Sequence, residues 1–220
     1  GMFGAAPASL LDLGAGAGHP VHHWVTPATH WTALEPSRYL RARLGRLART
    51  SHPGLHPMAG RWQDLPRLGL APHAIAFAAN IGAPLEAPGA LLTLMRAHAT
   101  RAVAWIVPAQ HGPRRWCLAG ALPASLHGEE ERPGVDVVLQ ALGTASRPHR
   151  TALFPWTFTA RFRDPTAAFA HCAAQLRLAP DDSRRAALAR HLDAALTAPA
   201  EGGVTLSAPK LSALLIWDLA

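Results

Sequence analysis

The 220-residue sequence has few cysteines, a single lysine, a single tyrosine and no long apolar run. Its two cysteines, Cys117 and Cys172, lie far apart and outside any CxxC spacing, which argues against a disulfide framework or a structural zinc site. No apolar stretch approaches the roughly 20 residues that a membrane-spanning helix needs. No charged segment leads into an apolar one at the start, as in a secretory signal. We therefore expect a cytoplasmic protein with no membrane partner.

Positive charge comes almost wholly from arginine, because Lys210 is the only lysine among 21 basic residues. A formal net charge of +7 can indicate a nucleic-acid partner. The arginines are scattered among alanines and prolines, however, so a nucleic-acid surface is the weaker interpretation, resting on charge alone. The length suits one domain with a sizeable core, and nothing in the sequence indicates an oligomeric state.

Strands and helices alternate over much of the chain. Short apolar segments predict strands at residues 8–13, 31–34, 55–58, 74–79 and 102–107. Apolar periodicity predicts helices at residues 38–49, 87–99, 166–177 and 183–196. Ser37 is placed to cap the first of these helices. Nearly continuous apolar strands that alternate with helices argue for a parallel sheet covered on both faces.

The regular alternation fails after residue 111. Glycine and proline punctuation predicts that residues 111–163 form a cap or insertion, with 151–163 extended. Residues 204–206 and 211–217 are predicted to pair as a terminal hairpin across "SAPK". An antiparallel pair that closes a parallel sheet would be unusual for a plain dinucleotide-binding fold.

The stretch "LLDLGAGAGHPVHHWV", residues 10–25, carries three alternating glycines after a buried strand. A phosphate-binding P-loop needs lysine after its last glycine, and His19 stands there. A GxGxxG dinucleotide fingerprint would place its third glycine at the same residue. The pattern that fits is acid-x-Gly-x-Gly-x-Gly, formed by Asp12, Gly14, Gly16 and Gly18.

This pattern resembles motif I of the class I S-adenosylmethionine-dependent methyltransferases. The resemblance implies a Rossmann-like doubly wound seven-stranded α/β sheet, mostly parallel with an antiparallel last strand. It also implies a single domain over residues 1–220, with the cap at 111–163 inside it, and S-adenosylmethionine as cofactor. Glycines suit this ligand because the backbone must approach it closely, and free N–H groups at the loop can face its carboxylate.

Family members also carry an acid at the end of the second strand, which accepts hydrogen bonds from both ribose hydroxyls. Glu35, in "WTALEPS", stands at that position, and the resemblance places Pro36 beside the adenine. Without the glycine loop, Glu35 would be read as a carboxylate favoured at a helix start.

Two further segments resemble the family with departures. "GRWQDLP", residues 60–66, looks like the family's Gly-Asp-Ala-x-x-Leu-Pro segment, but Arg61 stands at the aspartate that would meet the adenine amino group. Asp64 is an alternative acid, and Trp62 could offer its backbone N–H or an aromatic wall. "HAIAFAANIGAPL", residues 73–85, resembles motif IV, with Asn80 where the strand leaves the sheet. Asn80 also suits a turn with unusual backbone angles.

Thirteen histidines raise the question of a metal. His19 and His23 have the i, i+4 spacing of a zinc pair, but no glutamate or cysteine accompanies them, so no metal site is predicted. Solvated histidines at the rim of the ligand site are the expected arrangement. His111, just past the fifth strand, is the candidate general base, although a surface-loop role competes with it.

Together the residues and the resemblance predict an S-adenosylmethionine-dependent methyltransferase that acts on a small molecule. Asn/Asp-Pro-Pro-Tyr/Phe is absent, and neither cysteine lies in a Pro-Cys context, which disfavours amino-methylating DNA enzymes and covalent pyrimidine methylation. One alternative is a catalytically silent binding or regulatory protein of the same fold. Its basis is Arg61, the missing motif IV aspartate and the short segment 2–8, which leaves the cofactor's cover to the insertion or another subunit. The other alternative is an RNA methyltransferase.

Overall fold

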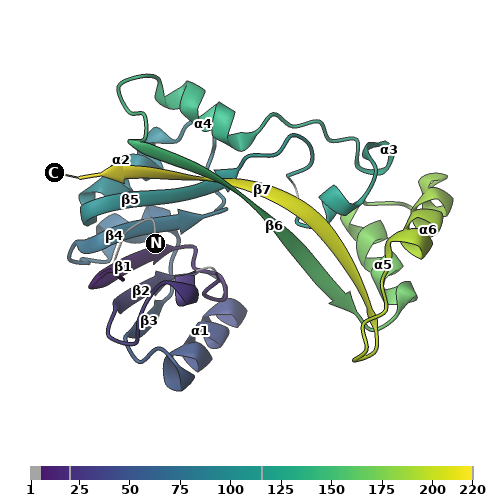
Figure 1. Ribbon diagram of the computed structural model, residues 1–220, viewed down its shortest axis with the longest axis horizontal. Helices are drawn as coiled ribbons and strands as arrows, with labels where there is room; N and C mark the ends of the chain where they lie inside the picture. Colours follow the sequence, from purple (N-terminus) through teal and green to yellow (C-terminus); the bar gives the residue numbers. More distant parts are fainter. Residues whose placement is uncertain (1–5, 20, 115, 220) are drawn as a thin grey trace. The chain divides into compact units, whose positions relative to one another are not determined.

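The computed structural model describes residues 6–19, 21–114 and 116–219, and its strands form one seven-stranded sheet (Figure 1). The strands are β1 Ser9–Leu13, β2 His30–Leu34, β3 Leu55–Met58, β4 His73–Ala79, β5 Ala99–Pro108, β6 Arg150–Phe162 and β7 Val204–Asp218. Their order across the sheet is β3-β2-β1-β4-β5-β7-β6. The sheet therefore places β1 between β2 and β4, as in a doubly wound fold.

Strands β1 to β5 are parallel to one another. β7 runs against β5, because the N–H of Leu219 bonds to Arg101 at one end while the N–H of Ala109 bonds to Leu211 at the other. β7 also runs against β6, where the N–H of His149 bonds to the carbonyl of Ile216. The predicted mostly parallel, seven-stranded sheet with an antiparallel last strand is confirmed.

Helices connect the strands near the predicted positions. The α-helices are α1 Arg38–Thr50, α2 Gly89–Ala97, α3 Ala124–His127, α4 Gly134–Leu142, α5 Pro165–Gln175 and α6 Arg184–Ala195, and the 3-10 helices are η1 Val21–His23, η2 Trp62–Arg67 and η3 Ala119–Ala121. Ser37 caps α1 as predicted, because its hydroxyl accepts a hydrogen bond from the N–H of Leu40 at 3.4 Å. α1 packs beside β3 and buries Leu44.

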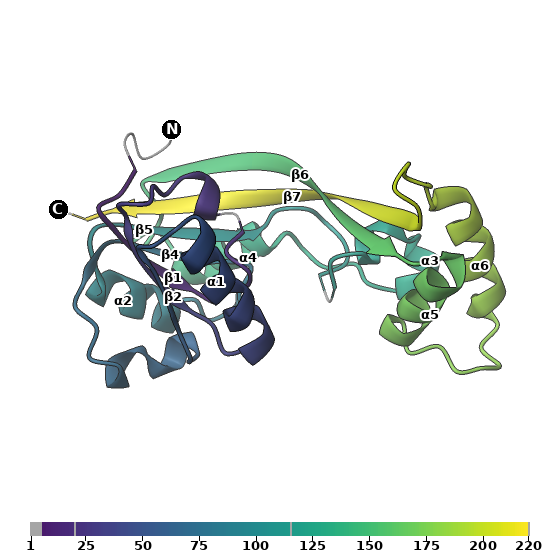
Figure 2. The same ribbon diagram turned by 90° about the horizontal axis from the view of Figure 1, so that it is seen from below.

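The chain folds as two compact units, and β6 and β7 contribute residues to both (Figure 2). The first unit comprises residues 1–107, 137–152 and 213–220 and holds the parallel strands, and most side chains of β1, β2, β4 and β5 are buried. The second unit comprises residues 108–136 and 153–212. Its core consists of Leu118, Leu122, Leu126, Cys172, Ala173, Leu178, Leu188, Leu192 and Leu206.

The predicted terminal hairpin is wrong. Residues 204–218 form one continuous strand, β7, and its antiparallel neighbour at the edge of the sheet is β6. Residues 150–162 of the predicted insertion therefore belong to the sheet, and residues 137–152 group with the first unit. The role of residues 111–163 as a cap stays a prediction.

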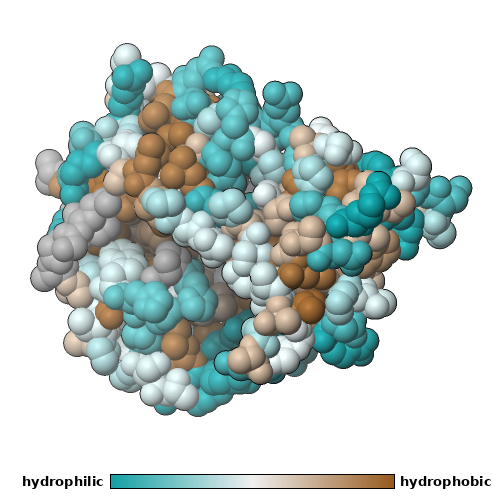
Figure 3. Space-filling model, turned by 45° about the vertical axis from the view of Figure 1, so that its right-hand side comes forward, coloured by the Kyte–Doolittle hydropathy of each residue, from teal (hydrophilic) through white to brown (hydrophobic). Residues whose placement is uncertain are grey.

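The surface mixes polar and apolar side chains. On the face drawn in Figure 3, hydrophobic residues show in several patches with hydrophilic ones between them. Among the described residues, the exposed large hydrophobic side chains are Tyr39 and Leu153. No helix in the described ranges is both long and apolar enough to cross a membrane.

We predict that Leu188→Ala destabilises the second unit, because this fully buried leucine packs between α6 and the rest of the core. The expected loss is about 2–5 kcal/mol in the free energy of unfolding, measured by urea denaturation. Leu153→Ala is the matched control, since Leu153 is 60% exposed in the same unit and should change stability by less than about 0.5 kcal/mol. Equal effects of the two substitutions would contradict this packing.

Candidate functional site

The candidate site lies in the first unit, where four neighbouring parallel strands end at one edge of the sheet. The glycine loop follows β1, Glu35 follows β2, residues 60–64 follow β3 and Asn80 follows β4. Ligands of open α/β sheets bind at this carboxyl edge. The sheet order therefore brings the predicted cofactor segments together.

The glycine loop is fastened to the end of β2 by its own backbone. The N–H groups of Gly14 and Ala15 both donate to the carbonyl of Leu34, at 2.8 and 3.1 Å. Gly14, Gly16 and Gly18 have φ values of 65°, 58° and 93°, in the left-handed region that side chains with a Cβ avoid. The alternating glycines therefore follow from the path of the chain.

The three glycines differ in what a Cβ would meet. At Gly14 it would lie 2.6 Å from Cγ2 of Ile81, and at Gly18 it would lie 3.0 to 3.3 Å from side chains of α1 and β2. At Gly16 it would meet no described atom within 4 Å. Gly14 and Gly18 are thus needed for packing, whereas the side of Gly16 faces open space.

Glu35 connects this loop to α1. Its carboxylate accepts the N–H of Gly16 at 2.9 Å and the N–H of Ser37 at 2.8 Å. The guanidinium of Arg41 donates to the backbone carbonyls of Glu35 and Pro36, both at 2.7 Å. Glu35 is 5% exposed and is therefore a fixed acceptor, while Pro36 is exposed beside it.

Asp12 lies beneath the loop, buried in the sheet with only 2% of its surface exposed. The indole Nε1–H of Trp31 donates to its carboxyl group at 3.2 Å. The pKa of Asp12 is raised to about 7, chiefly by burial and to a smaller extent by the charge of Glu35, while the hydrogen bond from Trp31 opposes the rise. The carboxyl group of Asp12 is therefore held to Trp31 of β2 inside the sheet and titrates near neutral pH.

The segment after β3 is organised by its own side chains. The carboxylate of Asp64 accepts the N–H of Arg61 at 2.7 Å and so closes the start of η2. Trp62 is half-buried, and its indole N–H is enclosed without a hydrogen-bond partner. Asp64 is thus engaged locally, and the predicted contact of Trp62 with a cofactor stays a prediction.

Asn80 and His111 complete the predicted residues. Asn80 has a φ of 48°, its N–H donates to Ile106 at 3.0 Å, and its side chain is exposed at the end of β4. Both interpretations of Asn80, as a turn residue and as a site residue, are compatible with this position. His111 is exposed in the second unit, and its role as a base stays a prediction.

Sequence reasoning missed two residues that shape this site. Ile81 packs on Gly14, and Arg41 holds the carbonyls that follow β2. Ile81 directly follows Asn80, which the sequence already places at the end of a strand, so its position near the loop could have been predicted. Arg41 lies among several arginines of a helix whose charged positions look alike in the sequence.

No protein-family profile matches the sequence, and no curated protein matches it. Solved structures do resemble it. A candidate methyltransferase from Bacillus halodurans is 11% identical with a TM-score of 0.54, over 99% of this chain and 95% of that one. The YcgJ protein from Bacillus subtilis is 14% identical with a TM-score of 0.53, over 98% and 93%. A candidate type II methyltransferase from Anaeromyxobacter dehalogenans is 16% identical with a TM-score of 0.52, over 96% and 89%.

At these low identities the likeness concerns the fold. The sheet order, the antiparallel β7 and the near-complete coverage agree with it. The chain has the class I S-adenosylmethionine-dependent methyltransferase fold, as the resemblance at the glycine loop implied.

We predict that Asp12→Asn changes the pH dependence of stability. The folded state raises the pKa of Asp12 to about 7, so it keeps a proton that the unfolded chain loses near pH 4. The contribution of Asp12 to the free energy of unfolding should therefore fall as pH rises from 5 to 7 and then level. Residue 12 cannot titrate in the Asp12→Asn variant. The free energy of unfolding of this variant minus that of the unsubstituted protein should therefore rise as pH rises from 5 to 7, by up to about 1.4 kcal/mol per pH unit. Urea denaturation between pH 5 and 8 measures this, and parallel pH curves would contradict it.

Proposed function

We propose that this protein is an S-adenosylmethionine-dependent methyltransferase that acts on a small molecule. The observation that carries the proposal is Gly16, whose missing side chain leaves open space at a loop that Glu35 holds in place. The methyltransferase fold supports the same conclusion. The small-molecule acceptor follows from the scattered arginines and the absent amino-methylating motif.

The residues present fit this cofactor chemically. Glu35 is a carboxylate acceptor at the end of β2, which suits the two hydroxyl donors of a ribose and would repel a phosphate. Each of its oxygens accepts one backbone N–H and retains further acceptor capacity. The open side of Gly16 permits close approach of the ligand to the backbone.

Gly14, Gly16 and Gly18 would hold the nucleoside and amino-acid parts through the backbone, with Asp12 beneath them. Pro36 and Trp62 would border the adenine, and Asn80 would face the cofactor from the end of β4. When bound, S-adenosylmethionine supplies an electrophilic methyl group. The chain's own contribution is to align the acceptor with that group, and His111 would take a proton if the nucleophile must lose one.

A catalytically silent binding protein of the same fold is the second candidate. The observation that favours it is the segment after β3, where Arg61 replaces the family's aspartate and Asp64 is bonded to the N–H of Arg61. The family's acid is then absent from its own position, and the alternative acid Asp64 is held toward the backbone of Arg61. Incubation with S-adenosylmethionine and a panel of small-molecule acceptors, with S-adenosylhomocysteine formation as the readout, separates the two candidates.

We predict that Gly16→Ala abolishes binding of S-adenosylhomocysteine, because the added Cβ would occupy the space of the ligand. Gly69→Ala is the matched control. Gly69 has a φ of 60° against 58° for Gly16, and a Cβ at either residue meets no described atom within 4 Å. The two substitutions should therefore lower stability alike, whereas calorimetry should show loss of binding only for Gly16→Ala.

Two results would count against the proposed function. One is the absence of heat when the unsubstituted protein is titrated with either S-adenosylmethionine or S-adenosylhomocysteine. The other is binding by Gly16→Ala that equals binding by Gly69→Ala, because the loop would then contact no ligand.

We also predict that Glu35→Gln weakens S-adenosylhomocysteine binding at least about tenfold, the usual cost of losing a charged acceptor. Glutamine keeps one oxygen for the N–H of Gly16, so the loop should retain its fold. Glu86→Gln is the control, because Glu86 is exposed in the loop before α2. Calorimetric affinities that are equal for both variants would exclude Glu35 as the ribose acceptor.

A further inference from the structure

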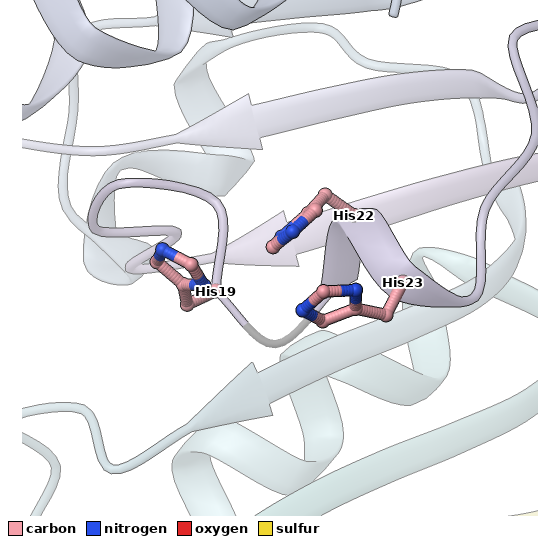
Figure 4. Close-up of side chains that lie close together, drawn as sticks. All are labelled: His19, His22 and His23. Carbon is pink, nitrogen blue, oxygen red and sulfur yellow. The ribbon is translucent and has the colours of Figure 1, made fainter. Parts of the chain in front are cut away.

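Three histidines gather directly after the glycine loop, as Figure 4 shows. His19 follows Gly18, and His22 and His23 lie on η1. One ring nitrogen from each lies within 4.8 Å of the other two. The three histidines also cluster in the sequence, where His19 and His23 have i, i+4 spacing, and the short 3-10 turn brings the ring of His22 to the same place.

The spacing of these nitrogens suits a metal ion after small side-chain rotations. Nitrogens bound to one tetrahedral Zn²⁺ at about 2.0–2.1 Å lie about 3.3 Å apart. His19 and His23 are exposed, so their rings can turn to close the difference, while His22 is half-buried and more constrained. Figure 4 shows the three rings grouped on one side of η1.

His22 is also oriented by a backbone group. Its Nδ1 lies 3.4 Å from the carbonyl oxygen of Gly18, which suits an Nδ1–H donor and leaves Nε2 free. Metal-bound histidines commonly donate their second N–H to a carbonyl in this way.

We propose that His19, His22 and His23 bind a first-row transition metal ion of the Zn²⁺ type. Imidazole is a favoured ligand of zinc, copper and nickel, and three protein nitrogens leave a fourth position for water or another ligand. The ion would fix residues 19–23 beside the last glycine of the loop. This proposal does not depend on the proposed methyl transfer.

The test is a titration of the tag-free protein with ZnCl₂, followed by calorimetry and by metal analysis after dialysis. We expect one equivalent bound with a dissociation constant in the micromolar range or below. The triple variant His19→Ala/His22→Ala/His23→Ala should lose this binding, and each single variant should weaken it at least tenfold. The double variant His56→Ala/His171→Ala should bind normally, because both histidines are exposed elsewhere.

Co²⁺ gives a second readout, since coordination by histidine nitrogens produces visible absorption bands that the triple variant should lack. Lowering the pH to 5 should release the ion, because protons compete for the nitrogens. If the triple variant fails to fold by circular dichroism, His19→Ala/His23→Ala replaces it, as both residues are exposed. An unsubstituted protein that binds no Zn²⁺, or histidine variants that bind it equally well, would overturn the proposal. S-adenosylhomocysteine binding in the presence of EDTA tests the proposed function separately.

Discussion

The architecture of the site depends on hydrogen bonds between the glycine loop and the end of β2. The N–H groups of Gly14 and Ala15 share the carbonyl of Leu34, and the N–H of Gly16 bonds to the carboxylate of Glu35. The loop makes these bonds with its glycines in left-handed backbone conformations, which explains why glycines recur there. The same carboxylate accepts the N–H of Ser37, so one side chain positions both the loop and the start of α1. The order of β1 and β2 in the sheet is what makes this bonding possible.

Much of the fold could be predicted from the sequence, because the parallel strands are short, apolar and separated by helices. β3 begins and ends where the residues predict, and the other parallel strands differ by one to three residues at a boundary. The hairpin was mispredicted because Pro209 and Lys210 looked like a turn. In β7, the backbone groups of Leu211 face the residues that follow β5. The carbonyl of Leu211 accepts the N–H of Ala109, and its N–H donates to the side-chain oxygen of Gln110. By alternation Pro209 faces the same way, where β5 has already ended, so its missing N–H leaves no strand bond unmade.

The site was predictable where residue type and spacing define the chemistry. The glycine loop and Glu35 lie together as the resemblance implied. The bonding of Asp64 to the N–H of Arg61 could not be predicted, because a carboxylate that caps a turn and one that faces a ligand have the same sequence appearance. The clustering of His19, His22 and His23 is visible in the sequence, but the approach of their ring nitrogens depends on a 3-10 turn instead of the α-helix that spacing suggested. The placement of these side chains depends on local hydrogen bonds and turns, which the residue pattern does not reveal.

The three glycines of the loop are subject to two different evolutionary constraints, and Gly16 differs from the other two. Gly14 and Gly18 are constrained by neighbouring side chains as well as by their left-handed backbone, so substitutions there would disturb the fold itself. Gly16 is required by its left-handed backbone but by no neighbouring protein atom, and asparagine tolerates that backbone conformation. A lineage that had ceased to use the pocket would be free to exchange Gly16 while it preserved the glycines on either side. Natural variation at this one position would therefore record whether the ligand is still under selection.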